Sequence, residues 1–90
     1  MRDAIMQAEL NAFARRLRET REARGWSQSD LARVVWGEIT TKDGRTIAAN
    51  RDRITTYELG KSWPDPANLW QIAAALNVPP EELAPSQDDL

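Results

Sequence analysis

The chain has 90 residues, of which 41% are hydrophobic and 29% are charged, and it contains no cysteine and no histidine. These numbers are typical of one globular domain, and they exclude disulfides, metal sites built from thiolates or imidazoles, and catalytic triads that need histidine. The longest apolar run covers residues 72–76, whereas a membrane-spanning helix needs about 20 apolar residues. The sequence therefore predicts a cytoplasmic binding domain without membrane contact, metal or cofactor, and not an enzyme.

The net charge is −2, but the charges are distributed unevenly along the chain. All 12 lysines and arginines lie within residues 1–61, and every charged side chain in residues 63–90 is acidic. Most of the basic residues are arginines, which form bidentate contacts with phosphate and guanine. This distribution favours a small DNA-binding domain whose C-terminal part faces another protein chain, although an ordinary solvated surface explains the charges equally well.

The first predicted helix begins at Asp3 or Ala4 and ends at Arg24, before Gly25. Glycine readily adopts the left-handed conformation that is common at the ends of helices. The apolar positions in this segment step by three and four residues, as one face of a helix does. This stripe consists of Met6, Leu10, Phe13 and Leu17.

A short second helix is predicted over residues 28–35. Ser27 is a strong N-cap residue, and Asp30 stands where a capping box normally has Glu or Gln. The residues expected to face inward are Leu31, Ala32 and Val35.

Residues 36–49 break the helical rhythm, and the Asp-Gly signal of a hairpin turn within them predicts a small β-hairpin at 38–49. A two-residue turn would pair Thr40 with Ile47 and place Ile39 on the opposite face. A three-residue loop with Gly44 as the bulge would instead pair Ile39 with Ile47. We favour this second register, because it puts the two large apolar residues on one face of a small β-hairpin. The alternative is a mobile loop.

The third predicted helix covers residues 51–59, with Asn50 as its cap and Gly60 at its end. One face follows the i, i+3, i+4 spacing and consists of Ile54, Tyr57 and Glu58. The opposite face consists of Arg51, Asp52, Thr55 and Thr56. The helix therefore has an apolar side that can be buried and a polar side that can contact a partner.

The fourth predicted helix is capped by Asp65, with Pro66 in its first turn. Its buried stripe consists of Leu69, Ile72, Ala73 and Leu76. A last helical turn is expected over residues 80–83, and residues 84–90 form an acidic tail.

Two charged residues stand where core residues are expected. Arg21 continues the apolar stripe of the first helix, and Glu58 belongs to the apolar face of the third. An unpaired buried charge is very unfavourable, so we expect the two side chains to form an ion pair that fastens the first helix to the third.

Four fragments in this order resemble the Cro/phage-repressor (XRE) family of helix-turn-helix domains over roughly residues 13–83. They are Leu17-x-x-x-Arg21, Gly25-Trp26-Ser27-Gln28-x-x-Leu31-Ala32, Ile54-x-x-Tyr57-Glu58-x-Gly60-Lys61 and Pro64 followed by Leu69-x-x-Ile72-Ala73-x-Ala75-Leu76-x-Val78. The resemblance implies an all-α, compact five-helix, lambda-repressor-like fold in which the second and third helices read DNA. Residues 1–90 would form a single such domain, with a helical extension at 1–12.

The same resemblance assigns roles to individual residues. Gln28 would hold a phosphate at the start of the second helix. The residues facing base edges would be Arg51, Asp52 and Thr56. The residues near the DNA backbone would be Arg53, Thr55 and Lys61. Arg21 and Glu58 match the family's internal ion pair.

The segment over residues 36–49 departs from the family, which joins the second and third helices by a short turn. Lys42 and Arg45 lie at the tip of the predicted hairpin, and we hypothesise that they touch a flanking phosphate or a minor groove. The alternative is that the segment packs on the domain through its large apolar residues Trp36, Ile39 and Ile47.

The predicted function is sequence-specific binding of double-stranded DNA by a transcriptional regulator. A repressor-like homodimer is expected, since one helix reads about half of a palindromic site. Trp63 and Trp70 are candidates for the dimer contact. The alternative is an antitoxin-type interaction module whose main partner is a protein.

Overall fold

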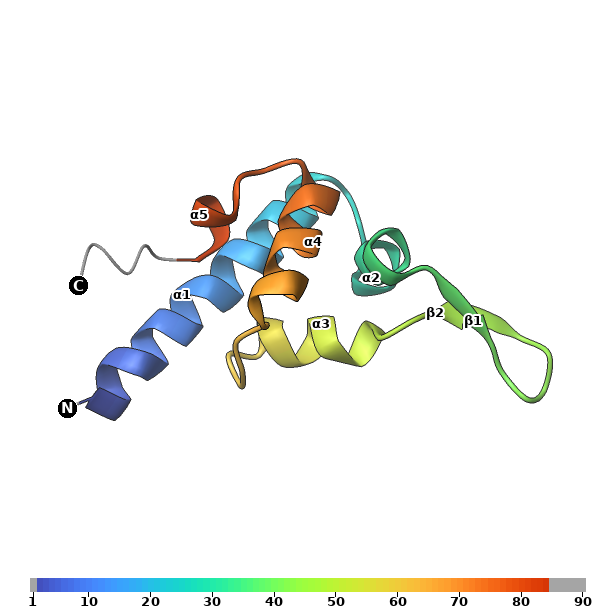
Figure 1. Ribbon diagram of the computed structural model, residues 1–90, viewed down its shortest axis with the longest axis horizontal. Coiled ribbons are helices and arrows are strands. Elements are labelled where there is room, and N and C mark those ends of the chain that lie inside the picture. Colours follow the sequence, from blue (N-terminus) through green and yellow to red (C-terminus); the bar gives the residue numbers. More distant parts are fainter. Residues whose placement is uncertain (1, 85–90) are drawn as a thin grey trace.

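The computed structural model describes residues 2–84 of the chain, and the side chains of residues 7–84. The elements in this part, in chain order, are α1 (Arg2–Ala23), α2 (Gln28–Trp36), β1 (Glu38–Thr40), β2 (Thr46–Ala48), α3 (Arg51–Glu58), α4 (Pro66–Leu76) and α5 (Pro80–Leu83). Figure 1 shows the start of α1 at one end of the molecule and the β1–β2 hairpin at the other, with the remaining helices gathered between them. The predicted class, helical with one small hairpin, is confirmed. No helix in this part is long and apolar enough to cross a bilayer.

The helix ends follow the expected capping chemistry. Gly25 follows α1 with a φ of 73°. At the start of α2, the Asp30 backbone N–H donates to Ser27 Oγ over 3.0 Å, and the Ser27 N–H donates to Asp30 Oδ2 over 2.9 Å. The hydrogen bond from the Ser27 backbone N–H is the main cause that lowers the pKa of Asp30, and the Ser27 side chain lowers it further. Asp65 likewise accepts from the Asn68 N–H at 2.7 Å and caps α4.

The core lies where α1, α2, α3 and α4 meet. Its largest fully buried side chains come from all the α-helices of the described chain and are Phe13, Leu17, Leu31, Ile54, Ile72, Leu76 and Leu83. The Phe13 ring packs edge-on against the Tyr57 ring, with 6.3 Å between the ring centroids. It also packs against the Trp63 ring in a tilted orientation, with 5.3 Å between the centroids. The described residues of the predicted apolar stripes are therefore buried, except Val35 and Leu69, which are partly buried and pack against the core. The Met6 side chain and residues 85–90 of the acidic tail lie outside the described part.

The segment between α2 and α3 is a β-hairpin in the predicted register, with Ile39 directly opposite Ile47. Gly44 has a φ of 88°, which permits the tight loop. Of the three residues in the packing alternative, Trp36 packs against the core, whereas Ile39 is 52% exposed and Ile47 is 41% exposed. Ala48 is the residue of this strand that enters the core. The pleat then turns its neighbour Ile47 to the opposite face.

Asn50 is the N-cap residue of α3, as predicted, but its side chain does not cap the helix. Asn50 precedes α3, but its side chain makes no capping hydrogen bond, and its φ of 58° places it in the left-handed region. An N-cap side chain reaches the first helical N–H groups from an extended backbone, which this residue lacks. Instead, the Arg53 N–H donates to the Asn50 carbonyl over 2.9 Å and closes the first turn.

Candidate nucleic-acid interface

The inner face of α3 is held by a buried ion pair. Arg21 Nε donates to Glu58 Oε2 over 2.7 Å, and Arg21 Nη2 donates to Glu58 Oε1 over 2.9 Å. Arg21 Nη1 also donates to the Trp26 carbonyl at 2.6 Å. The hydrogen bond to Glu58 raises the pKa of Arg21. Both side chains are buried, so the pairing expected from the sequence joins α1 to α3 through a two-pronged, charge-assisted contact.

A second polar connection joins α2 to α3. Gln28 Nε2 donates to Glu58 Oε1 at 3.2 Å, and the Thr55 hydroxyl donates to Gln28 Oε1 at 2.6 Å. Gln28 and Thr55, which the family resemblance places near phosphates, therefore bond to each other in the free protein. Together with Arg21 they form a continuous chain that fixes α2 against α3. The hairpin replaces the tight turn between these helices, so this chain supplies a direct link that the longer connection does not.

The first turn of α3 carries exposed charged residues. Arg51, Asp52 and Arg53 are all exposed. Arg51 Nη2 lies 3.7 Å from Asp52 Oδ1, with 59% and 96% of the two side chains exposed. Thr56 is half-buried, and its hydroxyl donates to the Asp52 carbonyl at 2.9 Å. The helix thus presents a charged first turn to solvent while its other side is anchored to the body.

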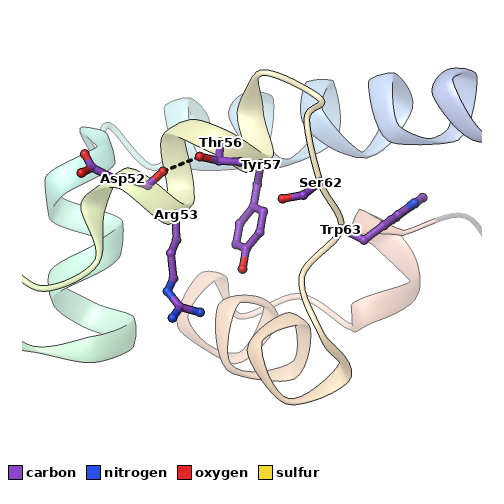
Figure 2. Close-up of a pocket in the computed structure, with 6 residues that line it drawn as sticks. All are labelled: Asp52, Arg53, Thr56, Tyr57, Ser62 and Trp63. Atoms are coloured by element: carbon purple, nitrogen blue, oxygen red, sulfur yellow. Dashed lines mark hydrogen bonds between the residues drawn. The ribbon is translucent and has the colours of Figure 1, made fainter.

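A pocket of about 300 Å³ lies beside α3, next to the segment that leads into α4. Figure 2 shows the Arg53 side chain and the Tyr57 ring extending in the same direction, with the Ser62 side chain pointing toward Tyr57. Asp52 points away from Arg53 in the same view (Figure 2). Lys61, next to Ser62, is exposed. The pocket lining therefore combines the charged residues Asp52 and Arg53 with three hydroxyl-bearing residues, Thr56, Tyr57 and Ser62.

Neither Ser62 nor the Tyr57 hydroxyl is among the site residues predicted from the sequence. Tyr57 lies on the core face of α3, which signalled a packing role only. Ser62 follows the Gly60-Lys61 fragment, and a polar residue directly after a family motif is the signal that points to it.

A larger groove of about 620 Å³ lies between the hairpin and the start of α3. Arg45 of the hairpin lines it together with Arg51 and Arg53. Arg45 Nε is 3.0 Å from Asp43 Oδ2 in the hairpin loop. A hydrogen bond from the Thr41 hydroxyl lowers the pKa of Asp43. Lys42, the other basic residue of the tip, is exposed.

Besides Val34 of α2, two large apolar side chains on or next to the helices are exposed. Trp70 of α4 is 65% exposed and Leu59, at the end of α3, is 61% exposed. Trp63, by contrast, is half-buried and packs on Phe13. Of the two tryptophans proposed for a dimer contact, Trp70 is therefore the one whose side chain is available.

The chain is similar to known proteins in sequence and fold. The family model of the helix-turn-helix domain matches residues 14–85. The restriction-modification controller protein C.AhdI from Aeromonas hydrophila is 31% identical over 86% of this chain and 94% of that chain, with a TM-score of 0.67. No curated protein matches the sequence.

Two further solved structures share the fold. An HTH_3 family transcriptional regulator from Vibrio cholerae is 22% identical, with a TM-score of 0.68 over 87% of this chain and 37% of that chain. The hypothetical transcription factor NHTF from Neisseria is 24% identical, with a TM-score of 0.69 over 93% of this chain and 83% of that chain. Because the family model matches most of this chain, the chain belongs to the helix-turn-helix domain family.

Proposed function

We propose that this protein binds double-stranded DNA at specific sequences and regulates transcription, with α3 in the major groove. One observation carries the proposal: the exposed run Arg51–Asp52–Arg53 begins a helix whose opposite face is locked to the core through Glu58. A rigid helix with an exposed basic first turn suits major-groove reading, where side chains at the N-terminal half of the helix contact base edges. The name of C.AhdI, a controller protein, supports a regulatory role.

The base contacts are assigned to the first turns of α3. Arg51 can donate two hydrogen bonds to the O6 and N7 atoms of guanine. Asp52 can accept from a cytosine amino group, or orient Arg51, whose Nη2 atom lies 3.7 Å away. The methyl group of Thr56 can contact a thymine methyl. Asp52 repels phosphate, so we assign it to base selection and not to affinity.

The backbone contacts are assigned to residues around this helix. Arg53 and Lys61 would pair with phosphates next to the pocket that Ser62 lines. Gln28 uses one amide N–H toward Glu58. The other N–H of its amide group can donate to a phosphate without breaking the link to α3. Thr55 supports that contact by donating to the Gln28 oxygen.

The hairpin tip adds a further basic site. Lys42 and Arg45 are exposed at the end of the hairpin, and we assign them to phosphates that flank the bases under α3. The projecting position of the hairpin in Figure 1 supports this reach.

We also propose a homodimer, since a two-fold pair of reading helices matches a palindromic site. The exposed Trp70 of α4 is the assigned contact, because a large exposed aromatic is typical of an interface core. We further propose that the protein has a binding role and not a catalytic one, and that it acts in the cytoplasm.

Selection from a random-sequence duplex library at a stated salt concentration tests the function. The selected duplex is then titrated with the full chain against a scrambled duplex of equal length. We expect the selected duplex to bind at least about 10³-fold more tightly and the complex mass to show two chains. Equal affinity for both duplexes would refute the proposal, and a co-purifying protein that blocks DNA binding would favour the antitoxin-type alternative.

A further inference from the structure

The apolar side of the hairpin is turned away from the core. Ile39 and Ile47 face each other across the two strands and are 52% and 41% exposed. Successive residues of a strand point to opposite faces. Since Ala48 is packed into the core, Ile47 and its partner must face outward. A pair of exposed isoleucines on a short, projecting hairpin needs an explanation other than packing.

This apolar pair lines the same groove as the arginines of α3. The groove between the hairpin and α3 is bordered by Ile39 and Ile47 together with Arg45, Arg51 and Arg53. Asp52 is the acidic residue among its lining. Cationic groups around an apolar patch match one strand of DNA, in which charged phosphates alternate with apolar sugars and, at thymines, a methyl group faces the major groove.

The distances along the chain permit a joint contact. Ile47 precedes Arg51 by four residues, which span at most about 14 Å of extended chain. The major groove is about 12 Å wide. Ile47 can therefore reach the edge of the groove whose bases Arg51 contacts, and Arg45, which directly precedes β2, lines the same groove as Ile47.

We infer that the hairpin is a second reading element: Ile39 and Ile47 contact the C5 methyl group of a thymine that flanks the bases under α3, and Arg45 holds a phosphate of the same strand. The inference rests on the proposed function, because it requires α3 to lie in the major groove. It adds sequence preference to a segment otherwise assigned only to phosphates.

The test replaces each thymine of the selected duplex, one at a time, by deoxyuridine, which removes the methyl group and leaves base pairing intact. We expect wild-type protein to lose about fourfold in affinity at one flanking thymine, the effect of one buried methyl group. The double variant Ile39→Thr/Ile47→Thr keeps strand-forming side chains. It should bind the thymine and deoxyuridine duplexes equally, at the affinity of wild-type protein for the deoxyuridine duplex.

Two matched variants separate this contact from others. Val34→Thr removes an apolar side chain of α2 that is 54% exposed and is not part of the groove lining, so it should keep the full thymine effect. Thr56→Ser removes the methyl group of α3, so it should lose the deoxyuridine effect at the thymine under α3 and keep the effect at the flanking thymine. If the double variant does not fold, loss of the flanking effect in Thr56→Ser would assign that thymine to α3 and overturn the inference.

The outcomes distinguish the inference from the proposed function. If wild-type protein prefers no duplex, the proposed function fails. If it prefers one, but no flanking thymine shows an effect or the double variant keeps that effect, only the inference fails. If the double variant changes the number of chains in the DNA-free assembly but keeps the response to thymine, a second copy covers the isoleucines and the inference is overturned.

Discussion

Helix α3 and the hairpin border the same proposed DNA surface, but they are held in different ways. α3 is held by the buried side chains Ile54, Tyr57 and Glu58 and by the ion pair to α1. Ala48 is the one strand residue of the hairpin that is buried. The hairpin is also held by a hydrogen bond from the Ala49 N–H to the Gly37 carbonyl and by the exposed ion pair between Arg33 and Glu38. Changes at the inner face of α3 should therefore alter folding stability, whereas changes in the hairpin should alter binding.

Removal of the buried arginine gives the largest expected effect. Arg21→Ala leaves Glu58 charged and buried without its main partner, which should lower the free energy of unfolding by about 3–5 kcal/mol. Urea denaturation followed by circular dichroism measures the loss. The control is Arg18→Ala, whose 4.0 Å contact with Glu22 is exposed and should contribute less than about 1 kcal/mol. Equal losses in the two variants would contradict the anchoring of α3.

Two glycines sharpen the comparison. Gly60 has a φ of +72°, and an added Cβ would lie 2.8 Å from Asn11 Oδ1. Gly60→Ala should therefore lower the free energy of unfolding by about 1–2 kcal/mol. Gly44→Ala meets the same backbone strain in the hairpin loop, where nothing lies within 4 Å, and the loop can rearrange without disturbing the core. Urea denaturation should show a smaller loss for Gly44→Ala, and a larger one would break the distinction between the two regions.

Most of the scaffold was predictable from the sequence because single residue types decide it. Ser27, Gly25 and Gly60 set helix ends, and Gly44 together with the two isoleucines set the hairpin register. The ion pair followed from two charges on apolar faces. These are local rules, and the structure obeys them.

The remaining features depend on tertiary context. Asparagine is favoured both as an N-cap and in the left-handed region, so the residue type of Asn50 did not decide between them. Hydrophobicity favoured burial of Ile47 over Ala48, but the path of the chain into α3 buries the smaller side chain. The amide of Gln28 can bind a phosphate or a carboxylate, and only the structure shows that Glu58 lies within reach. The DNA contacts themselves stay predictions.

The capping box of α2 gives a pH-dependent prediction on the stable side of the comparison. The pKa of Asp30 is lowered in the folded protein, so its carboxylate stabilises the fold above the unfolded pKa of about 3.9. That contribution is lost as pH falls through the lower folded pKa. Asp30→Asn should be less stable than wild type at neutral pH, and the difference should narrow below about pH 4. A difference that stays constant in urea titrations across this range would contradict the capping role.

The hairpin tip should show the smallest effect on stability. Lys42→Ala/Arg45→Ala should change the free energy of unfolding by no more than about 0.5 kcal/mol, because both side chains are exposed. The same variant should reduce the slope of log affinity against log salt by about 2 if both side chains meet phosphates. Titration of the selected duplex at several salt concentrations measures the slope, and an unchanged slope would remove the hairpin tip from the DNA contact.

The central claim is that the exposed side of α3 reads base edges, and Arg51→Ala tests it most directly. The quantity to measure is the ratio of affinities for the selected and the scrambled duplex, with Arg15→Ala as a control that removes an exposed arginine of α1. Arg51→Ala should reduce the discrimination by about 1–3 kcal/mol, with unchanged folding stability, while Arg15→Ala keeps it. The claim would be contradicted if Arg51→Ala kept the affinity ratio of the wild-type protein, or if both variants lowered that ratio equally.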